Sequence, residues 1–156
     1  MPAVAALPVQ PSRIFIVENL ATGLAFSDIP GAVVFMARGY AVDILDRIPW
    51  LRDLPTAYWG DIDTWGLAML ASARRHLPQL HALLMDRATL LAHTAHWGEE
   101  PQPLLRNLPW LTAEEGALFD DLRDNRLQTR LRLEQERVGF GWVQRALMGL
   151  KIPGGC

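Results

Sequence analysis

The chain of 156 residues has little cysteine and lysine. Its one cysteine, Cys156, excludes an intramolecular disulfide and fits a reducing compartment. Its one lysine, Lys151, lies close to the end of the chain, so any site elsewhere that needs a lysine lacks one. No run approaches the ~20 apolar residues of a membrane span. A net charge of −2 gives no strong overall field to attract nucleic acid, although a local basic patch stays compatible with it. We therefore expect a cytoplasmic protein with no membrane partner.

The length and composition are those of one globular domain, since half of the residues are hydrophobic. Residues 1–12 are rich in proline and lack a charged start, so we expect an extended or disordered segment and no signal peptide. Residues 13–150 are predicted to form a single domain, with 13–97 as its α/β core. Residues 98–150 are predicted to be a connector and a helical extension, and 151–156 a frayed tail.

Four short apolar runs in the first two thirds of the chain predict buried strands. Each is bounded by turn residues and is apolar on both faces, which is typical of parallel strands covered by helices. The runs are IFIV (14–17), AVVFMA (32–37), TAYW (56–59) and LHALLM (80–85). Helical patterns lie between them at 40–48 and 64–76, with a weaker one at 19–28. This alternation predicts an α/β fold with about four parallel strands flanked by helices.

The last third of the chain has a different pattern. Residues 98–111 contain three prolines and no clear period, so they are predicted to be a connector. Thr112 and Glu115 have the spacing of a capping box that begins a helix. Asn125 marks a break, and helices are predicted to follow at 127–138 and 141–150.

Three acidic residues follow strands that are expected to be neighbours. In the segment YWGDIDT (58–64), Asp61 and Asp63 come directly after the third strand, and Glu18 comes directly after the first. In the common strand order 2-1-3-4 these strands lie side by side, and functional groups gather at their carboxyl ends. Three converging carboxylates would repel one another unless a cation neutralised them, and oxygen ligands favour Mg²⁺ or Mn²⁺. The alternative is that each acid caps a turn or helix, with Asp63 as the N-cap of the helix at 64–76.

The segments IFIVENLAT (14–22), VVFMARGYAV (33–42), YWGDIDTWG (58–66), LLMD (83–86) and RLEQERV (132–138) resemble the C-terminal, Toprim-like part of the Wadjet defence subunit JetD. The resemblance covers most of residues 13–150 in the same order. It implies a Toprim metal site in which Glu18, Asp61 and Asp63 bind Mg²⁺ or Mn²⁺ and carry the catalysis. Two positions depart from the family pattern. Trp65 stands where a histidine often follows, and Arg38 stands in place of the first glycine of a Gly-Gly pair.

The function implied by this resemblance is magnesium-dependent DNA endonuclease activity in plasmid restriction. The implied partners are DNA and an SMC-like ATPase complex, and a homodimer is left open. The mechanism would be metal-assisted phosphodiester hydrolysis, with Glu18 as a metal ligand or a general acid/base. A transesterification would need a tyrosine nucleophile. Tyr58 is expected in the core and Tyr40 at the start of a helix, so hydrolysis is favoured.

Two more acids are candidate site residues. Glu134 shares a predicted helical face with Leu127, Leu131 and Val138, where a carboxylate needs a partner. A buried ion pair with Arg132 or Arg74 is the favoured explanation, but the RLEQE motif keeps Glu134 as a candidate. Asp86 follows the fourth strand and either approaches the metal site or caps the next turn.

Arginines and a tryptophan are the candidate DNA contacts. Arg38 and Arg132 are the named candidates for the DNA backbone. A basic run is interleaved with acids, so a salt-bridged surface is favoured over a DNA track; it consists of Arg123, Arg126, Arg130, Arg132 and Arg137. Trp65 could stack on a base, although packing under the sheet is the expected role. His93 and His96 have too few companions for a zinc site.

Two other functions compete with the nuclease. A haloacid-dehalogenase-like phosphatase also places D-x-D after a strand, but Trp65 occupies a position that this class gives to Thr or Val. That class also needs a lysine near the site. The other alternative is a non-catalytic Toprim module that keeps the fold to bind DNA or a protein partner.

Overall fold

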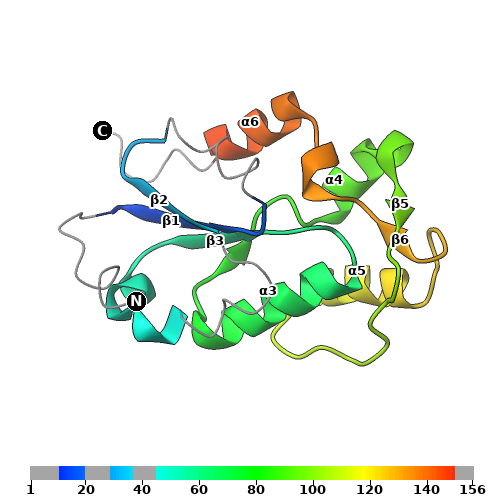
Figure 1. Ribbon diagram of the computed structural model, residues 1–156, viewed down its shortest axis with the longest axis horizontal. Helices are drawn as coiled ribbons and strands as arrows, with labels where there is room; N and C mark the ends of the chain where they lie inside the picture. The colour runs from blue at the N-terminus through cyan, green and yellow to red at the C-terminus, as the bar shows by residue number, and fades with distance from the viewer. Residues whose placement is uncertain (1–10, 20–28, 37–44, 150–156) are drawn as a thin grey trace.

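The computed structural model describes residues 11–19, 29–36 and 45–149. Four strands there form one parallel sheet in the order β2-β1-β3-β4. The strands are β1 (Arg13–Val17), β2 (Ala32–Met36), β3 (Thr56–Trp59) and β4 (His81–Ala82). The predicted α/β class, with four parallel strands flanked by helices, is confirmed, as is the strand order (Figure 1).

The two central strands supply the middle of the hydrophobic core. Ile14 to Val17 of β1 and all four residues of β3 are buried. Helices cover both faces of the sheet, so alternate side chains on either face need apolar surroundings, and the strands are apolar throughout. In the register of this pair Val17 lies opposite Trp59. The residues that follow the two strands therefore emerge at the same edge of the sheet.

Helices lie on both sides of the sheet (Figure 1). On one side α3 (Thr64–His76) packs with α5 (Ala113–Arg123), and α4 (Arg87–Ala92) and α6 (Phe140–Gly149) lie on the other. The helix predicted at 64–76 is confirmed residue for residue. The capping box of Thr112 and Glu115 is present in full at the start of α5. The C-terminal helix begins one residue earlier than predicted. None of the helices in the described part of the chain is long and apolar enough to cross a membrane.

The fourth strand is shorter than predicted. Only His81 and Ala82 pair with β3, although the amide of Leu83 still donates to the carbonyl of Tyr58 at 2.8 Å. Leu84 has φ of 59°, a left-handed conformation that turns the chain out of the sheet. Asp86 then caps α4, a helix that was not predicted from the sequence.

The predicted helix at 127–138 is wrong. Leu131 and Arg132 form β6, which pairs antiparallel with β5 (Gly98–Glu99), and Gln135–Arg137 form only the short 3-10 helix η4. Leu133 and Ile62 exchange both backbone hydrogen bonds, at 2.9 and 3.0 Å. Leu131 and Leu133 are both buried, two residues apart on one side of an extended segment, so Leu131 belongs to a strand pattern and not to the predicted helical face.

Short elements complete the described chain. They are the 3-10 helices η2 (Pro49–Asp53) and η3 (Thr94–His96), and the connector 98–111 is irregular after β5. Part of the predicted helix at 40–48 is a 3-10 turn at 45–47. Several predictions fall outside the described residues, namely those for 1–10, 20–28, 40–44 and 151–156, and those for Arg38 and Tyr40.

Candidate functional site

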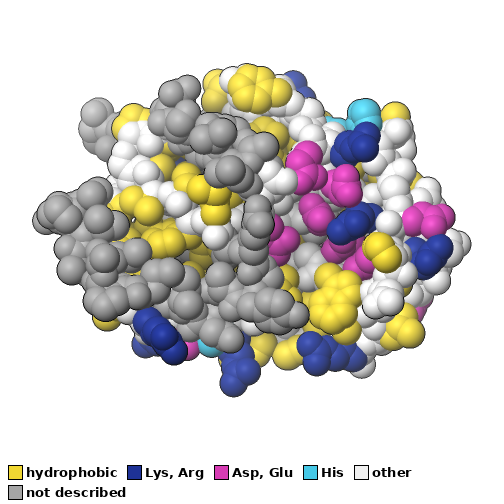
Figure 2. Space-filling model, viewed as in Figure 1, with side chains coloured by type: hydrophobic (Ala, Val, Ile, Leu, Met, Phe, Trp, Pro, Cys, Tyr) yellow, Lys and Arg dark blue, Asp and Glu magenta, His cyan; other side chains and the backbone are white. Residues whose placement is uncertain are grey.

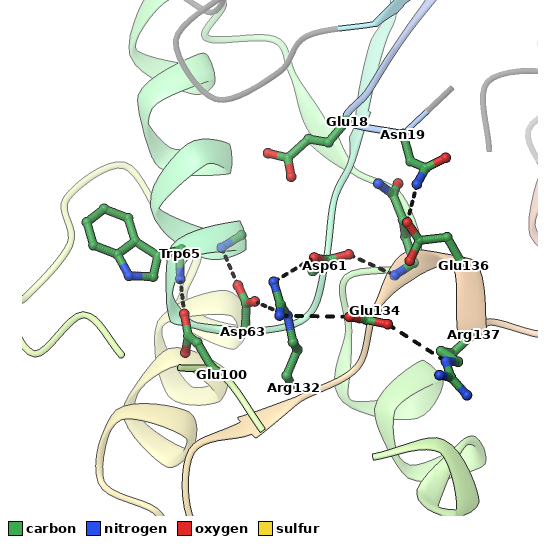
Figure 3. Close-up of polar contacts among 12 residues, drawn as sticks. Glu18, Asn19, Asp61, Asp63, Trp65, Glu100, Arg132, Glu134, Glu136 and Arg137 are labelled. Atoms are coloured by element: carbon green, nitrogen blue, oxygen red, sulfur yellow. Dashed lines mark hydrogen bonds and ion pairs between the residues drawn. The ribbon is translucent and has the colours of Figure 1, made fainter. Parts of the chain in front are cut away.

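The structure brings the three predicted acids together. Glu18 follows β1, and Asp61 and Asp63 follow β3, its parallel neighbour. Their side chains line one cavity of about 300 Å³ at the carboxyl edge of the central strands (Figure 3). The other residues that line it are Trp65, Gly66, Met69 and Arg132. The convergence follows from the strand order, because β1 and β3 are adjacent and end in register.

Asp63 is the most deeply buried of the three acids. Its Oδ1 accepts a hydrogen bond of 2.6 Å from the amide of Gly66, so it is the N-cap of α3, as the capping alternative predicted. Its Oδ2 lies 3.0 Å from Nε of Arg132. Burial raises the pKa of Asp63 to about 7, and repulsion from Glu100 and Asp61 adds to this rise. Capping and a role in the cavity are compatible, since each carboxylate oxygen has a different neighbour.

Asp61 is held in the same way by one of its oxygens. Its Oδ1 accepts a hydrogen bond of 2.8 Å from the amide of Gln135, and its Oδ2 faces Nη2 of Arg132 at 3.5 Å. Burial raises the pKa of Asp61, although the amide of Gln135 and the charge of Arg132 oppose the rise. The backbone of Asp61 passes so close to Gly66 that only glycine fits there, because a Cβ would lie 1.9 Å from the carbonyl oxygen of Asp61.

Glu18 lies across the cavity from the two aspartates. It accepts a hydrogen bond from the hydroxyl of Tyr58, and burial raises the pKa of its carboxyl group. Burial and the charge of Glu18 raise the pKa of Tyr58 well above its ordinary value. Tyr58 is therefore a neutral donor in the core, which agrees with its predicted place in the strand. Its hydrogen bond to Glu18 was not predicted from the sequence.

Arg132 is the cation that the two aspartates share. It extends from β6 so that its guanidinium lies beside Oδ2 of both Asp61 and Asp63, while Nη1 lies 3.8 Å from Oε1 of Glu134 (Figure 3). The buried Nε has no well-directed hydrogen bond despite its closeness to Asp63. Across residues 11–19, 29–36 and 45–149, no three His, Cys, Asp or Glu side chains form a group that could hold a metal ion. The oxygen donors suit a hard cation, but the guanidinium takes up the shared position between the aspartates.

Glu100 is a buried acid that the sequence did not point to. Only 2 % of it is exposed, and its carboxylate accepts hydrogen bonds from the hydroxyl and amide of Thr64 and from the amide of Trp65. It thereby satisfies the first amides of α3, which Asp63 does not reach. Glu100 lies in the proline-containing connector, where no periodic pattern marks a buried side chain.

Comparison with known protein families shows which family the chain belongs to. The family model of the Wadjet protein JetD, C-terminal, matches residues 1–147, which is nearly the whole sequence. The chain belongs to this family. The resemblance drawn from five segments of the sequence is thus confirmed. Family membership supports a role in the Wadjet anti-plasmid system, which has several subunits. Comparison with curated proteins gives no match.

The other two acidic candidates do not line the cavity of the three acids in this JetD-family chain. Glu134 belongs to no regular helix and is 42 % exposed, so the predicted buried helical face is wrong. It pairs with Arg132, one of the two predicted partners, but this ion pair is partly exposed and not buried as predicted; it also pairs with Arg137 at 3.7 Å. Asp86 caps α4 by accepting a hydrogen bond of 2.8 Å from the amide of Thr89, and it lines a different cavity.

Trp65 differs from its predicted role. Its side chain lies at the cavity and 45 % of the residue is exposed, so the expected packing under the sheet is wrong.

His93 packs edge-on against Trp142 and hydrogen-bonds to backbone atoms, as an ordinary structural histidine does. The basic run forms a salt-bridged surface as predicted, except for Arg132.

Proposed function

We propose that this chain is a Toprim-type, metal-dependent DNA endonuclease domain that acts in plasmid restriction together with an SMC-like complex. The proposal depends above all on one observation. Three acidic side chains from the ends of two adjacent parallel strands line one cavity, in a chain of the JetD family. Perturbed carboxyl groups gathered in a cleft are typical of functional sites, and the pKa values of all three acids are raised.

The residues that would hold Mg²⁺ or Mn²⁺ are Glu18, Asp61 and Asp63. When bound, a divalent cation would supply charge neutralisation of the phosphate and activation of water for phosphodiester hydrolysis. Oδ2 of both aspartates already faces a cation, the guanidinium of Arg132. Arg132 would have to move aside, and its planar donors suit a DNA phosphate at the rim of the cavity.

The chain's own hydrogen bonds would position these acids for catalysis. Oδ1 of Asp61 and Oδ1 of Asp63 are fixed by backbone amides, which leaves one oxygen of each directed at the cavity. Glu18 is oriented by the buried hydroxyl of Tyr58. Burial raises the pKa of Glu18 above the ordinary value of a glutamate, a direction that suits general acid/base catalysis.

Binding of the metal is tested first, because it does not depend on other subunits. Millimolar Mg²⁺ or Mn²⁺ should raise the melting temperature of the wild-type chain. Asp61→Asn should abolish the rise, since the amide keeps an acceptor for Gln135 but loses the charge. Asp86→Asn is the matched control at a capping aspartate outside the cavity, and it should keep the rise. If neither metal changes the melting temperature of the wild-type protein, the proposal is contradicted.

Catalysis is tested by the nicking of supercoiled plasmid in Mn²⁺. Glu18→Gln should abolish nicking while the Tyr58 hydroxyl keeps an acceptor.

A second candidate, the non-catalytic DNA- or partner-binding module, is favoured by the ion pairs of Arg132, which neutralise the aspartates without a metal. That module predicts DNA binding without nicking and without a metal-induced rise in melting temperature.

A further inference from the structure

Trp65 is an exposed aromatic side chain with a fixed orientation. Its indole Nε1 donates a hydrogen bond of 2.7 Å to the carbonyl of Gln102, and its amide donates one of 3.1 Å to Glu100. The residue nevertheless remains 45 % exposed at the start of α3. The ring is held by its polar atom and is open to solvent, so it is not packed into the core. Its orientation is pre-organised for contact with a ligand.

The cavity at Trp65 has two chemically different walls. Trp65 and Met69 are four residues apart on α3, so both lie on the same helical face. With Gly66 they form the part of the lining that α3 contributes, and the three carboxylates and the guanidinium of Arg132 complete it. Figure 2 shows acidic and basic side chains gathered on one part of the surface with hydrophobic side chains next to them. A ligand that fits such a cavity has a flat apolar part close to a charged part.

A nucleotide has this pattern, since its base offers a π-face and its phosphate a charge. The cavity volume of about 300 Å³ is at the lower end for small ligand sites, so it suits one base or sugar and not a longer segment. The faces of paired bases in a duplex are covered by their neighbours. Contact with the ring therefore requires an unpaired or flipped base.

We propose that Trp65 stacks on an unpaired nucleobase of DNA bound at the carboxylate cavity and so gives this chain a preference for single-stranded or frayed DNA. The proposal rests on the proposed function, because a phosphate close to three acids requires a cation to offset their charge. Stacking does not need base-edge hydrogen bonds, so the preference is for unpaired DNA and not for a sequence.

The test measures binding of fluorescently labelled single-stranded and duplex oligonucleotides in Ca²⁺, which replaces Mg²⁺ to slow cleavage. Trp65→Ala should weaken binding of the single strand about tenfold, within the usual effect of removing one stacking partner. Trp65→Phe should keep most of the affinity, because the ring remains although the hydrogen bond to Gln102 is lost. Trp110→Ala removes a similarly exposed tryptophan outside the cavity and should have no effect.

A base analogue whose fluorescence is quenched by stacking adds a direct readout. Quenching should be seen with the wild type and Trp65→Phe and be lost in Trp65→Ala. Unchanged affinity and quenching in Trp65→Ala overturn this inference, as does equal binding of duplex and single strand or no binding by the wild type. The metal-induced rise in melting temperature should persist in Trp65→Ala. If it persists there while stacking fails, the proposed function stands without this subsite.

Discussion

Replacement of Asp63 by asparagine should reduce the dependence of stability on pH. Asp63 is 2 % exposed, and its burial together with repulsion from Glu100 raises its pKa from 3.8 to about 7. The folded chain therefore binds this proton more tightly than the unfolded chain does. Between these two pKa values the unfolded state carries fewer protons, so stability falls as the pH rises.

The size of the effect follows from the two pKa values. A single carboxyl group with a pKa of 3.8 unfolded and about 7 folded lowers the free energy of unfolding by about 2–3 kcal/mol between about pH 5 and about pH 8. Asparagine has no proton to lose in this range, and its carbonyl oxygen can still accept the hydrogen bond from Gly66. Glu18 and Asp61 also have raised pKa values, so the variant should keep a smaller slope of the same sign.

The assay is urea denaturation of the wild type and Asp63→Asn across this pH range, with a chelator present to remove divalent ions. The difference between the two profiles isolates the titration of Asp63, because the other groups are common to both proteins. Asp86→Asn makes the same substitution at another N-cap and should follow the wild-type profile. Parallel profiles for the wild type and Asp63→Asn would refute the reasoning.

Further predictions concern Gly66 and Arg132, which line the cavity with the acids, and Gly116 as a control. Gly66→Ala should destabilise the chain by about 3 kcal/mol or more in urea denaturation, because its Cβ would lie 1.9 Å from the backbone oxygen of Asp61. Gly116→Ala, where a Cβ meets nothing within 4 Å, should instead stabilise α5 by about 0.5–1 kcal/mol. Arg132→Met should cost about 3 kcal/mol at most near neutral pH, since it removes the cation beside a buried carboxylate. The same variant should enlarge the Mn²⁺-induced rise in melting temperature, and a smaller rise would contradict the idea that guanidinium and metal compete.

The sheet and the meeting of the three acids could be predicted because local sequence determines them. Strands buried on both faces need continuous apolar runs, and those runs are short and bounded by turn residues. Adjacency of β1 and β3 then follows from the usual order of such sheets, which brings Glu18 to the aspartates. The start of α3 could also be predicted, since Asp63 precedes a helical pattern in the sequence and is the N-cap of α3 in the structure.

The rest of the site could not be predicted because distant pairing determines it. The spacing of Leu127, Leu131 and Val138 suits a helix, but the backbone of Leu133 pairs with Ile62 and overrides that preference. This pairing is what carries Arg132 to the aspartates. Glu100 is buried only because the connector returns to the first turn of α3, where free amides need acceptors.

Charge balance at the cavity gives the physical reason to expect a ligand there. Asp61 and Asp63 share a single guanidinium, Arg132, which also pairs with Glu134. The pKa values of Glu18, Asp61 and Asp63 remain raised although Arg132 is present, so its compensation is incomplete. Raised pKa values mean that the acids hold protons more tightly than in water, and a second cation would displace those protons. Metal binding and proton release at this cavity are therefore linked, and the metal-induced rise in melting temperature should be larger at about pH 8 than at about pH 6.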